Sequence, residues 1–476
     1  MSLQLRTAIA TATAVALAGG LLTAVTAAPA VAAAAKYADD FNGDGHRDLA
    51  IGAPYKTIDG ASAAGGVVVA FGSSTGLTTK KVGLTQSSSG VPGTPEEGDH
   101  FGMSIASGDL DADGYADLVV GADGEDVGSN EGQGSVTILW GGTRPFTSST
   151  TTVVADPHQW QGHGWDVAVG DFTGDSGADL AVIDSDSVAV YAGGLARGSQ
   201  PVPTYTGLTG PGGQLGNSEA AVGDIDGDGK DDLAVTGRDD GNDRPAVDVF
   251  YGRTGRPQPG ARVTGGGTDV ALGDVNGDGY DDMAASLTWP ELYSAADPSG
   301  GAGFVTVRYG SESGVGGPVV IHQNSTGVPG ANEDSDGFGC SLAFGDITGD
   351  GRDELVVGAN GEDLGSVKNA GDVTVFRGSA SGVSMSGVVR VSQDTTAVPG
   401  GPETDDLFGA RVRLVDYNRN GKADLAVTAS FENTRSGALW SLPGTSSGLT
   451  GSGSKVFTSG DYGLANGSRF GESMLD

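Results

Sequence analysis

Short apolar runs separated by glycine- and serine-rich turns set the pattern of this chain. A typical run is LAIGAP at residues 49–54, and about 15 to 20 residues later a second run, VVVAFG at 67–72, ends in the turn SSTG. Runs this short, bounded by turn residues, are typical of β-strands. Beyond the N-terminal segment, no stretch keeps a 3.6-residue period for longer than two turns. The pattern therefore predicts an all-β protein built from many short strands.

The same arrangement returns seven times along the chain. Each repeat begins with an aspartate-rich segment of nine residues, and successive starts are 69, 62, 53, 50, 72 and 70 residues apart. Each repeat has room for about four strands, and seven such units favour blades around a central channel. We therefore predict a seven-bladed β-propeller of four-stranded antiparallel blades, with a linear solenoid as the alternative. The segments are DFNGDGHRD (40–48), DLDADGYAD (109–117), DFTGDSGAD (171–179), DIDGDGKDD (224–232), DVNGDGYDD (274–282), DITGDGRDE (346–354) and DYNRNGKAD (416–424).

The two ends of the chain favour a closed ring over a solenoid. Phe-Gly stands eight residues before the aspartate-rich segment in three repeats, at Phe101, Phe338 and Phe408. The first repeat lacks it, whereas Phe470-Gly471 near the C-terminus has no such segment after it. We therefore expect the C-terminal strand to pair with the N-terminal blade, which would complete that blade and remove two open sheet edges.

Phe-Gly, the aspartate-rich segment and a following Gly-Ala-Pro (residues 52–54) together resemble the FG-GAP repeat of the integrin α-subunit N-terminal propeller. Bacterial secreted FG-GAP proteins share this pattern. The resemblance covers essentially all of residues 36–476 and implies the same seven-bladed fold. The sequence shows no inserted adhesion domain, leg domains or transmembrane helix, so we do not expect an integrin receptor. Three repeats depart from the pattern and replace Phe-Gly, with His163-Gly164, Leu215-Gly216 and Gly266-Gly267.

The aspartate-rich segments have the spacing of calcium-binding loops. Side-chain oxygens at positions 1, 3, 5 and 9 and the backbone carbonyl at position 7 would form an oxygen cage suited to Ca²⁺, and glycine at position 6 permits the positive φ of the reversal. An EF-hand needs glutamate at position 12 and flanking helices, but position 12 is an apolar strand residue in every repeat, such as Ile51 and Val120. We therefore predict calcium sites in β-hairpin loops. Positions 1, 3, 5, 7 and 9 are, repeat by repeat, Asp40, Asn42, Asp44, His46 and Asp48; Asp109, Asp111, Asp113, Tyr115 and Asp117; Asp171, Thr173, Asp175, Gly177 and Asp179; Asp224, Asp226, Asp228, Lys230 and Asp232; Asp274, Asn276, Asp278, Tyr280 and Asp282; Asp346, Thr348, Asp350, Arg352 and Glu354; Asp416, Asn418, Asn420, Lys422 and Asp424.

The predicted sites differ in quality. Repeats 2 and 4 each offer four carboxylates and are the best. Repeat 3 is weaker because Thr173 is a poor ligand and Ser176 replaces the reversal glycine, and repeat 7 keeps only Asp416 and Asp424 as charged ligands. The alternative is that aspartate and asparagine are merely favoured in turns, and it stays open chiefly for repeats 3 and 7. Crowded carboxylates repel one another without a cation, so we predict that calcium stabilises the fold and takes no part in catalysis.

Composition narrows the function further. The 476 residues include 85 glycines and a single cysteine, and 61 acidic against 26 basic side chains give a formal net charge of −35. Such a polyanion is not expected to bind nucleic acid, because the phosphate contribution would be repulsive. One cysteine excludes an internal disulfide framework.

The N-terminal segment has the features of a secretory signal peptide. A basic residue, Arg6, precedes an apolar stretch at residues 8–22, and small-residue cleavage sites follow at 28–32. We therefore predict a signal peptide at residues 1–35, a propeller at residues 36–476 and a secreted, extracellular protein. An N-terminal membrane anchor is the alternative. No later stretch approaches 18 consecutive apolar residues, so no membrane span is expected after signal cleavage.

No motif for catalysis stands out. The sequence contains no HExxH metal motif, phosphate loop or GxSxG nucleophile elbow. We predict a calcium-stabilised, monomeric binding or adhesion module for an extracellular protein or glycan, and Trp289 and Tyr293 in an inserted loop are candidate recognition residues. A propeller enzyme acting on polysaccharide, as lyase or hydrolase, and a structural wall or matrix protein are the alternatives. The enzyme would need a Lys, Arg, Tyr or His cluster in the central funnel.

Overall fold

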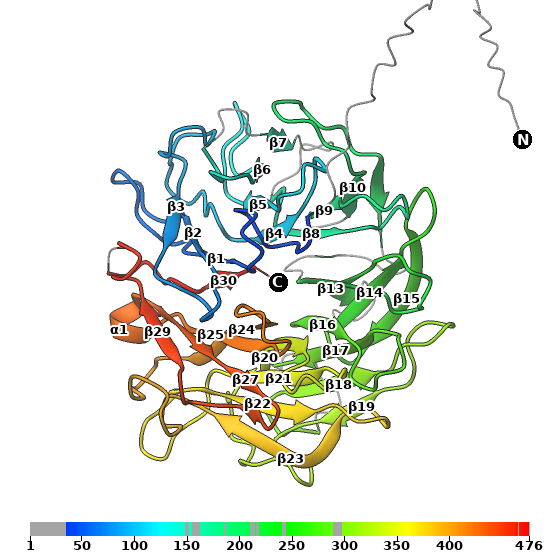
Figure 1. The fold of residues 1–476 in the computed structure, drawn as a ribbon, viewed down its shortest axis with the longest axis vertical. Helices are drawn as coiled ribbons and strands as arrows, with labels where there is room; N and C mark the ends of the chain where they lie inside the picture. Colours follow the sequence, from blue (N-terminus) through cyan, green and yellow to red (C-terminus); the bar gives the residue numbers. More distant parts are fainter. Residues whose placement is uncertain are drawn as a thin grey trace, which may run out of the picture.

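Seven four-stranded antiparallel sheets stand around a central axis in the computed structural model of the protein (Figure 1). The structure describes residues 35–147, 152–154, 162–184, 187–209, 215, 219–239, 244–288, 298–464 and 466–475. Residues 1–34, Trp289 and Tyr293 therefore lie outside the described residues, so the predicted signal peptide and the inserted recognition loop stay predictions.

Each sheet is one blade, and in blades 2 to 7 the strands follow the chain from the inside of the ring outward. Blade 1 contains β30 (Ser473–Met474), β1 (Leu49–Gly52), β2 (Val67–Ala70) and β3 (Lys81–Leu84), and blade 2 contains β4 (Ile105–Gly108), β5 (Asp117–Ala122), β6 (Ser135–Leu139) and β7 (Thr152–Val154). Blade 3 contains β8 (Asp166–Gly170), β9 (Asp179–Ile183), β10 (Val188–Tyr191) and β11 (Tyr205–Leu208), and blade 4 contains β12 (Ala220–Gly223), β13 (Asp232–Asp239), β14 (Arg244–Tyr251) and β15 (Gln258–Thr264).

The remaining three blades are built in the same way. Blade 5 contains β16 (Val270–Gly273), β17 (Asp282–Leu287), β18 (Phe304–Arg308) and β19 (Val319–Ile321), and blade 6 contains β20 (Phe338–Gly345), β21 (Glu354–Ala359), β22 (Asp372–Arg377) and β23 (Ser384–Val391). Blade 7 contains β24 (Phe408–Val415), β25 (Asp424–Ala429), β26 (Ala438–Leu442) and β29 (Lys455–Thr458), with the four-residue α1 (Glu432–Arg435) between β25 and β26 and an unpredicted hairpin of β27 (Gly444–Thr445) and β28 (Gly448–Leu449).

The position of a strand within its blade explains its hydrophobic pattern. The second strands, such as β5 and β21, are buried at every residue because both faces of a blade pack against neighbouring blades. The outermost strands are far less buried, and β23 carries exposed and half-buried residues along most of its length. The apolar clusters accordingly lie between blades, and one of them joins residues of blades 1, 2 and 7.

The C-terminal strand closes the ring, as predicted. β30 pairs antiparallel with β1 through Ile51 opposite Met474 and Gly52 opposite Ser473. The backbone N–H of Leu475 also donates to the carbonyl of Ala50 at 3.0 Å. Because blade 1 takes its innermost strand from the other end of the chain, the solenoid alternative is wrong.

In blades 1, 2, 6 and 7, Phe-Gly fixes the start of the innermost strand against the preceding blade. The N–H of Phe101 donates to the carbonyl of Ala64 in blade 1, and the phenyl ring is buried. Gly102 has a φ of +93°, and a Cβ there would lie 2.8 Å from the carbonyl oxygen of Gly66, so only glycine fits. In blade 3, the N–H of His163 makes the corresponding bond to the carbonyl of Gln133 in blade 2, and its side chain is also buried. Blades 3 to 5 therefore form without the Phe-Gly pair.

Candidate metal centre

Each aspartate-rich segment forms a loop between the innermost and second strands of its blade; we number the loops 1 to 7 with their repeats. In all seven, Oδ1 of the position-1 aspartate accepts the N–H of position 5 at 3.0–3.1 Å. Its Oδ2 accepts the N–H of position 6 at 2.8–3.0 Å. The backbone turn is therefore the same in loops 3 and 7, where the predicted ligands are weakest.

Two positions of each loop need a left-handed backbone. The predicted reversal at position 6 has φ between +70° and +94° in every loop, including Ser176 at +70° in loop 3. Position 4 also has positive φ throughout, a requirement that the sequence analysis missed. The signal in the sequence was the glycine at position 4 of five loops, since glycine adopts positive φ most easily. The other two loops have Ala112 and Arg419 at this position, with φ of +57° and +61°.

The position-9 carboxylates anchor the loops to the blades. Oδ1 of Asp117 accepts the N–H of Gly141 at 2.8 Å, and its Oδ2 accepts that of Leu110 at 2.9 Å. All seven position-9 side chains are buried. Burial raises the pKa of these carboxyls, to about 8 for Asp48 and Asp117, about 7 for Asp232, Asp282 and Glu354, and about 6 for Asp424.

The position-3 side chains carry the clearest sign of a bound cation. In five loops a position-3 oxygen is buried and has no hydrogen-bond partner: Asp111 Oδ1, Thr173 Oγ1, Asp226 Oδ1, Asn276 Oδ1 and Thr348 Oγ1. A buried oxygen without a partner is costly, and carboxylate, amide and hydroxyl oxygens are the ligands that Ca²⁺ takes. The residues present therefore fit a hard divalent cation in these loops. In loops 1 and 7 the corresponding oxygens, on Asn42 and Asn418, accept the N–H of position 5.

Loops 2 and 4 bring the largest number of carboxylates together. Ligand oxygens of Asp109, Asp111 and Asp113 lie within 4.8 Å of one another, and so do those of Asp224, Asp226 and Asp232. These are the only such groups of three in the part of the chain that the structure describes. The ranking of loops 2 and 4 as the most acidic sites therefore agrees with the geometry, although the metal itself stays a prediction.

Position 7 contributes its backbone to the loop. The N–H of Tyr115 donates to Oδ1 of Asp113 at 3.1 Å, and five other loops repeat this bond. Two position-7 side chains also pair with the position-5 carboxylate of their own loop, Lys230 with Asp228 at 3.0 Å and Arg352 with Asp350 at 3.4 Å.

Neighbouring loops are joined into a chain around one face of the ring, a feature that the sequence analysis missed. The N–H of Asp281, at position 8 of loop 5, donates to the carbonyl of Asp224 at 2.9 Å, and its Oδ2 accepts the N–H of Asp224 at 2.8 Å. Asp231 and Asp353 make the same pair of bonds to Asp171 and Asp274. An aspartate at position 8, directly before the position-9 carboxylate, was the available signal in the sequence.

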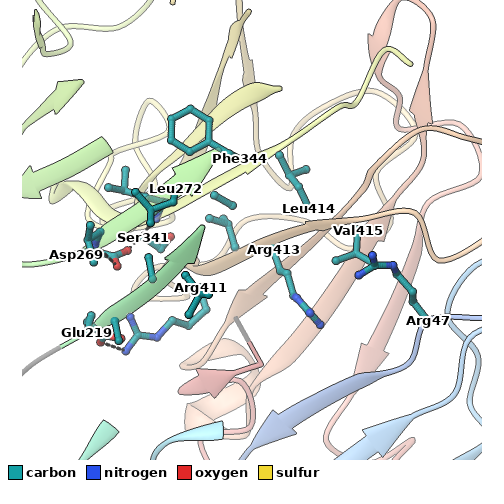
Figure 2. A pocket seen from close by; sticks show the side chains of 18 residues that line it. Arg47, Glu219, Asp269, Leu272, Ser341, Phe344, Arg411, Arg413, Leu414 and Val415 are labelled. Atoms are coloured by element: carbon teal, nitrogen blue, oxygen red, sulfur yellow. Dashed lines mark hydrogen bonds and ion pairs between the residues drawn. The ribbon is translucent and has the colours of Figure 1, made fainter. Parts of the chain in front are cut away.

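The innermost strands enclose a channel with an unpredicted row of arginines. A cavity of about 270 Å³ lies between β12, β16, β20 and β24. Figure 2 shows Arg411, Arg413 and Arg47 one after another along this cavity. Arg411 pairs with Glu219 at 2.9 Å, which links blade 7 to blade 4 across the ring, while Arg413 and Arg47 pair with the buried Asp39 at 3.2 and 3.4 Å.

A second cavity, of about 300 Å³, opens at the channel end away from the loops. Tyr55 and Trp165 line it together with Asp166, Glu219 and Arg411. Met103 and Trp165 come just before the innermost strands β4 and β8, whereas the aspartate-rich loops follow the far ends of those strands. We call this cavity the upper mouth; it combines aromatic rings with charges of both signs.

Comparison with known proteins supports the repeat assignment. Four segments match the family model described as FG-GAP repeat, at residues 38–69, 101–139, 338–376 and 408–442. They fall in blades 1, 2, 6 and 7, whose innermost strands begin at Phe-Gly or shortly after it.

The similar curated proteins match only part of the chain. Phosphatidylinositol-glycan-specific phospholipase D of Rattus norvegicus is 31% identical over 160 residues, which cover 33% of this chain and 19% of the relative. Integrin alpha-5 of Xenopus laevis is 33% identical over 122 residues, which cover 25% of this chain and 10% of the relative. The chain thus matches about a fifth or less of the length of these relatives.

Similar solved structures are more distant in sequence. AofleA from Arthrobotrys oligospora, in an arginine-to-alanine mutant form, gives a TM-score of 0.40 at 11% identity, over 72% of this chain and 82% of that chain. Hydrazine synthase of Kuenenia stuttgartiensis also gives 0.40, at 13% identity, over 92% and 99%. Within the described residues, no helix is long and apolar enough to cross a membrane.

Proposed function

Because this chain is a seven-bladed propeller that carries FG-GAP repeats, we propose that it is a calcium-stabilised binding module for an extracellular protein or glycan. The observation that carries the proposal is that the two ends of the channel differ in their chemical character. One end holds the chained acidic loops, and the other holds the upper mouth. A rigid ring that presents a polar and aromatic cavity is a common architecture for ligand binding.

In this proposal, calcium binds in the aspartate-rich loops at one end of the channel and stabilises them. The buried position-3 oxygens of five loops and the grouped carboxylates of loops 2 and 4 supply the donor set. Extracellular modules typically bind calcium with a Kd of about 10⁻⁴ to 10⁻³ M. The similarity to integrin alpha subunits is consistent with an extracellular, calcium-containing setting.

The ligand occupies the upper mouth. Tyr55 and Trp165 are half-buried, and Arg469 lies over one face of the Tyr55 ring, 4.6 Å from its centre. Asp166, Glu219 and Arg411 offer hydrogen-bonding groups around the two rings. Aromatic rings that stack, beside a few polar groups that fix orientation, suit a sugar ring or an exposed peptide segment. The three channel arginines each pair with a carboxylate, so we assign them no catalytic role.

Glycan and protein arrays probed with the purified chain in millimolar calcium test this proposal. We expect a restricted set of retained ligands and at least a tenfold loss of retention for Trp165→Ala, which removes one ring of the upper mouth. Val202→Ala, at a valine that is 81% exposed, is the matched control and should bind as the wild type does. No retained ligand, or equal retention by Trp165→Ala, would refute binding at this mouth.

A further inference from the structure

Two arginines bridge carboxylates of the most acidic loops. Arg197 donates from Nε to Oδ2 of Asp111 and from Nη2 to Oδ2 of Asp113, at positions 3 and 5 of loop 2. Arg253 donates from Nη2 to Oδ2 of Asp226 and from Nη1 to Oδ2 of Asp228, at the same positions of loop 4. Each guanidinium thus bridges two carboxylates with one charge-assisted hydrogen bond to each.

The two arginines reach equivalent places from different parts of the fold. Arg197 lies between β10 and β11 and crosses from blade 3 to the loop of blade 2. Arg253 lies between β14 and β15 and contacts the loop of its own blade 4. Both arginines lie in the connection between the third and fourth strands of a blade, and they reach the same two loop positions from the neighbouring blade in one case and from the same blade in the other.

Each guanidinium also lies over an aromatic ring. Arg197 lies 5.4 Å from the ring centre of Trp140 in blade 2, and Arg253 lies 5.1 Å from that of Tyr251 in blade 4. Both rings stand at the end of the third strand, directly before the glycine whose N–H bonds the position-9 carboxylate. Each arginine is therefore held by an aromatic face and two carboxylates.

Charge explains why these two loops need the contact. Loops 1, 3, 5 and 6 carry three carboxylates among positions 1, 3, 5, 7 and 9, and loop 7 carries two. Loops 2 and 4 carry four, and they alone have carboxylates at both positions 3 and 5. In each of these loops one guanidinium adds a formal positive charge beside the four carboxylates, and in loop 4 the ammonium group of Lys230 adds a second one at Asp228.

The guanidinium groups hold the outer oxygens of these carboxylates and leave the inner ones available. Oδ1 of Asp111 and Oδ1 of Asp226 are buried without a partner, whereas their Oδ2 atoms accept the arginines. The arginine therefore occupies only the outer oxygen of each carboxylate. The inner oxygen stays available to a cation while the arginine is bound.

We propose that Arg197 and Arg253 are built-in counter-ions that stabilise loops 2 and 4 before calcium arrives and that weaken the affinity of these loops for it. The inference rests on the proposed calcium binding. Without metal, the arginine offsets the repulsion among four carboxylates. With metal, the same positive charge repels the calcium ion. Because the arginine stabilises the metal-free loop more than the calcium-bound loop, it lowers the affinity of the loop for calcium.

Thermal unfolding of the Arg197→Gln/Arg253→Gln double variant, in EDTA and across a calcium titration, tests the proposal. In EDTA we expect its Tm to fall below that of the wild type by about 2 °C or more. In saturating calcium the difference should shrink. The calcium midpoint of loops 2 and 4, measured by calorimetric titration, should tighten about three- to tenfold, since a unit charge beside the ion is removed.

Matched variants separate this effect from a general loss of packing. Arg256→Gln, at an exposed arginine in the turn that holds Arg253, should leave both the Tm and the calcium midpoint unchanged. Adding Asp111→Asn and Asp226→Asn to the double variant gives loops 2 and 4 the asparagine that loops 1 and 5 have at position 3. This fourfold variant should return to the Tm of the wild type in EDTA, because loops 2 and 4 then carry three carboxylates each.

The outcomes distinguish this inference from the proposed function. If calcium stabilises the wild type but the double variant is lowered equally in EDTA and in calcium, with an unchanged midpoint, the counter-ion role is wrong and calcium binding stands. If the wild type does not respond to calcium at all, both proposals are wrong.

Discussion

At the scale of single residues, the backbone requirements of the loops are stricter than the choice of ligands. Positions 4 and 6 have positive φ in all seven loops, whatever oxygen stands at position 3. Most of this can be deduced from the sequence, because glycine fills these positions in most repeats. Ser176, at +70°, keeps the conformation at an energetic cost.

Ser176→Gly should therefore stabilise the protein. Glycine removes the steric cost of the left-handed backbone, and only part of this gain is offset by the greater freedom of glycine in the unfolded chain. We expect an increase of about 0.5 kcal/mol in the free energy of unfolding, measured by urea denaturation in EDTA. Ser446→Gly, at an exposed serine outside the positive-φ set, should be neutral or slightly destabilising. Equal effects of the two substitutions would contradict this account.

At the scale of elements, loops that lie far apart in the sequence meet at the upper end of the blades through carboxylates and glutamines. Gln86, before β4, donates to Glu125, after β5, and Gln323 with Glu362 and Gln393 with Glu432 repeat the pair in blades 6 and 7. Burial raises the pKa of Glu125 to about 7, and Asp99, Glu96 and Asp126 add repulsion.

The raised pKa of Glu125 predicts a stability that falls with pH. A carboxyl whose folded pKa of about 7 exceeds its usual 4.5 contributes stability that is complete below about pH 4.5 and is lost as the pH rises through 7. Glu125→Gln mimics the protonated form, so its Tm should exceed that of the wild type at pH 8 and match it near pH 5. The gain should be about 1 kcal/mol, reduced from the full shift because the side chain is half-buried.

The control for this prediction is Glu312→Gln, at an exposed glutamate. Thermal unfolding at pH 5, 6, 7 and 8 should show a pH-dependent difference for Glu125→Gln and none for Glu312→Gln. A difference of the same size at every pH would mean that packing, and not ionisation, is responsible.

At the scale of the whole molecule, ring closure depends on the last residues of the described chain. Phe470, Met474 and Leu475 are buried in the cluster that joins blades 1, 2 and 7. Gly471 donates its N–H to the carbonyl of Gly52 at 3.0 Å. The tail therefore supplies both the packing and the pairing that complete blade 1.

Removal of residues 470–476 should open the ring. We expect the free energy of unfolding to fall by about 5 kcal/mol or more, since several large buried side chains are lost together. The uncovered edge of β1 should also promote association between chains. Phe470→Ala keeps β30 and should cost about 3–5 kcal/mol without a change in oligomeric state. Thermal unfolding and light scattering measure both effects; a shortened chain as stable as the wild type would disprove this closure.

The seven blades, their strands, the closure by the tail and the candidate loops can all be predicted from the amino-acid sequence alone. These follow from local signals: alternating or continuous apolar runs, turn residues and a fixed spacing of carboxylates. Tertiary structure decided which distant side chains meet those loops. Arg197 reaches Asp111 from 86 residues away, and Arg411 reaches Glu219 from 192. No local pattern encodes such pairs, because they depend on how neighbouring and opposite blades are placed around the ring.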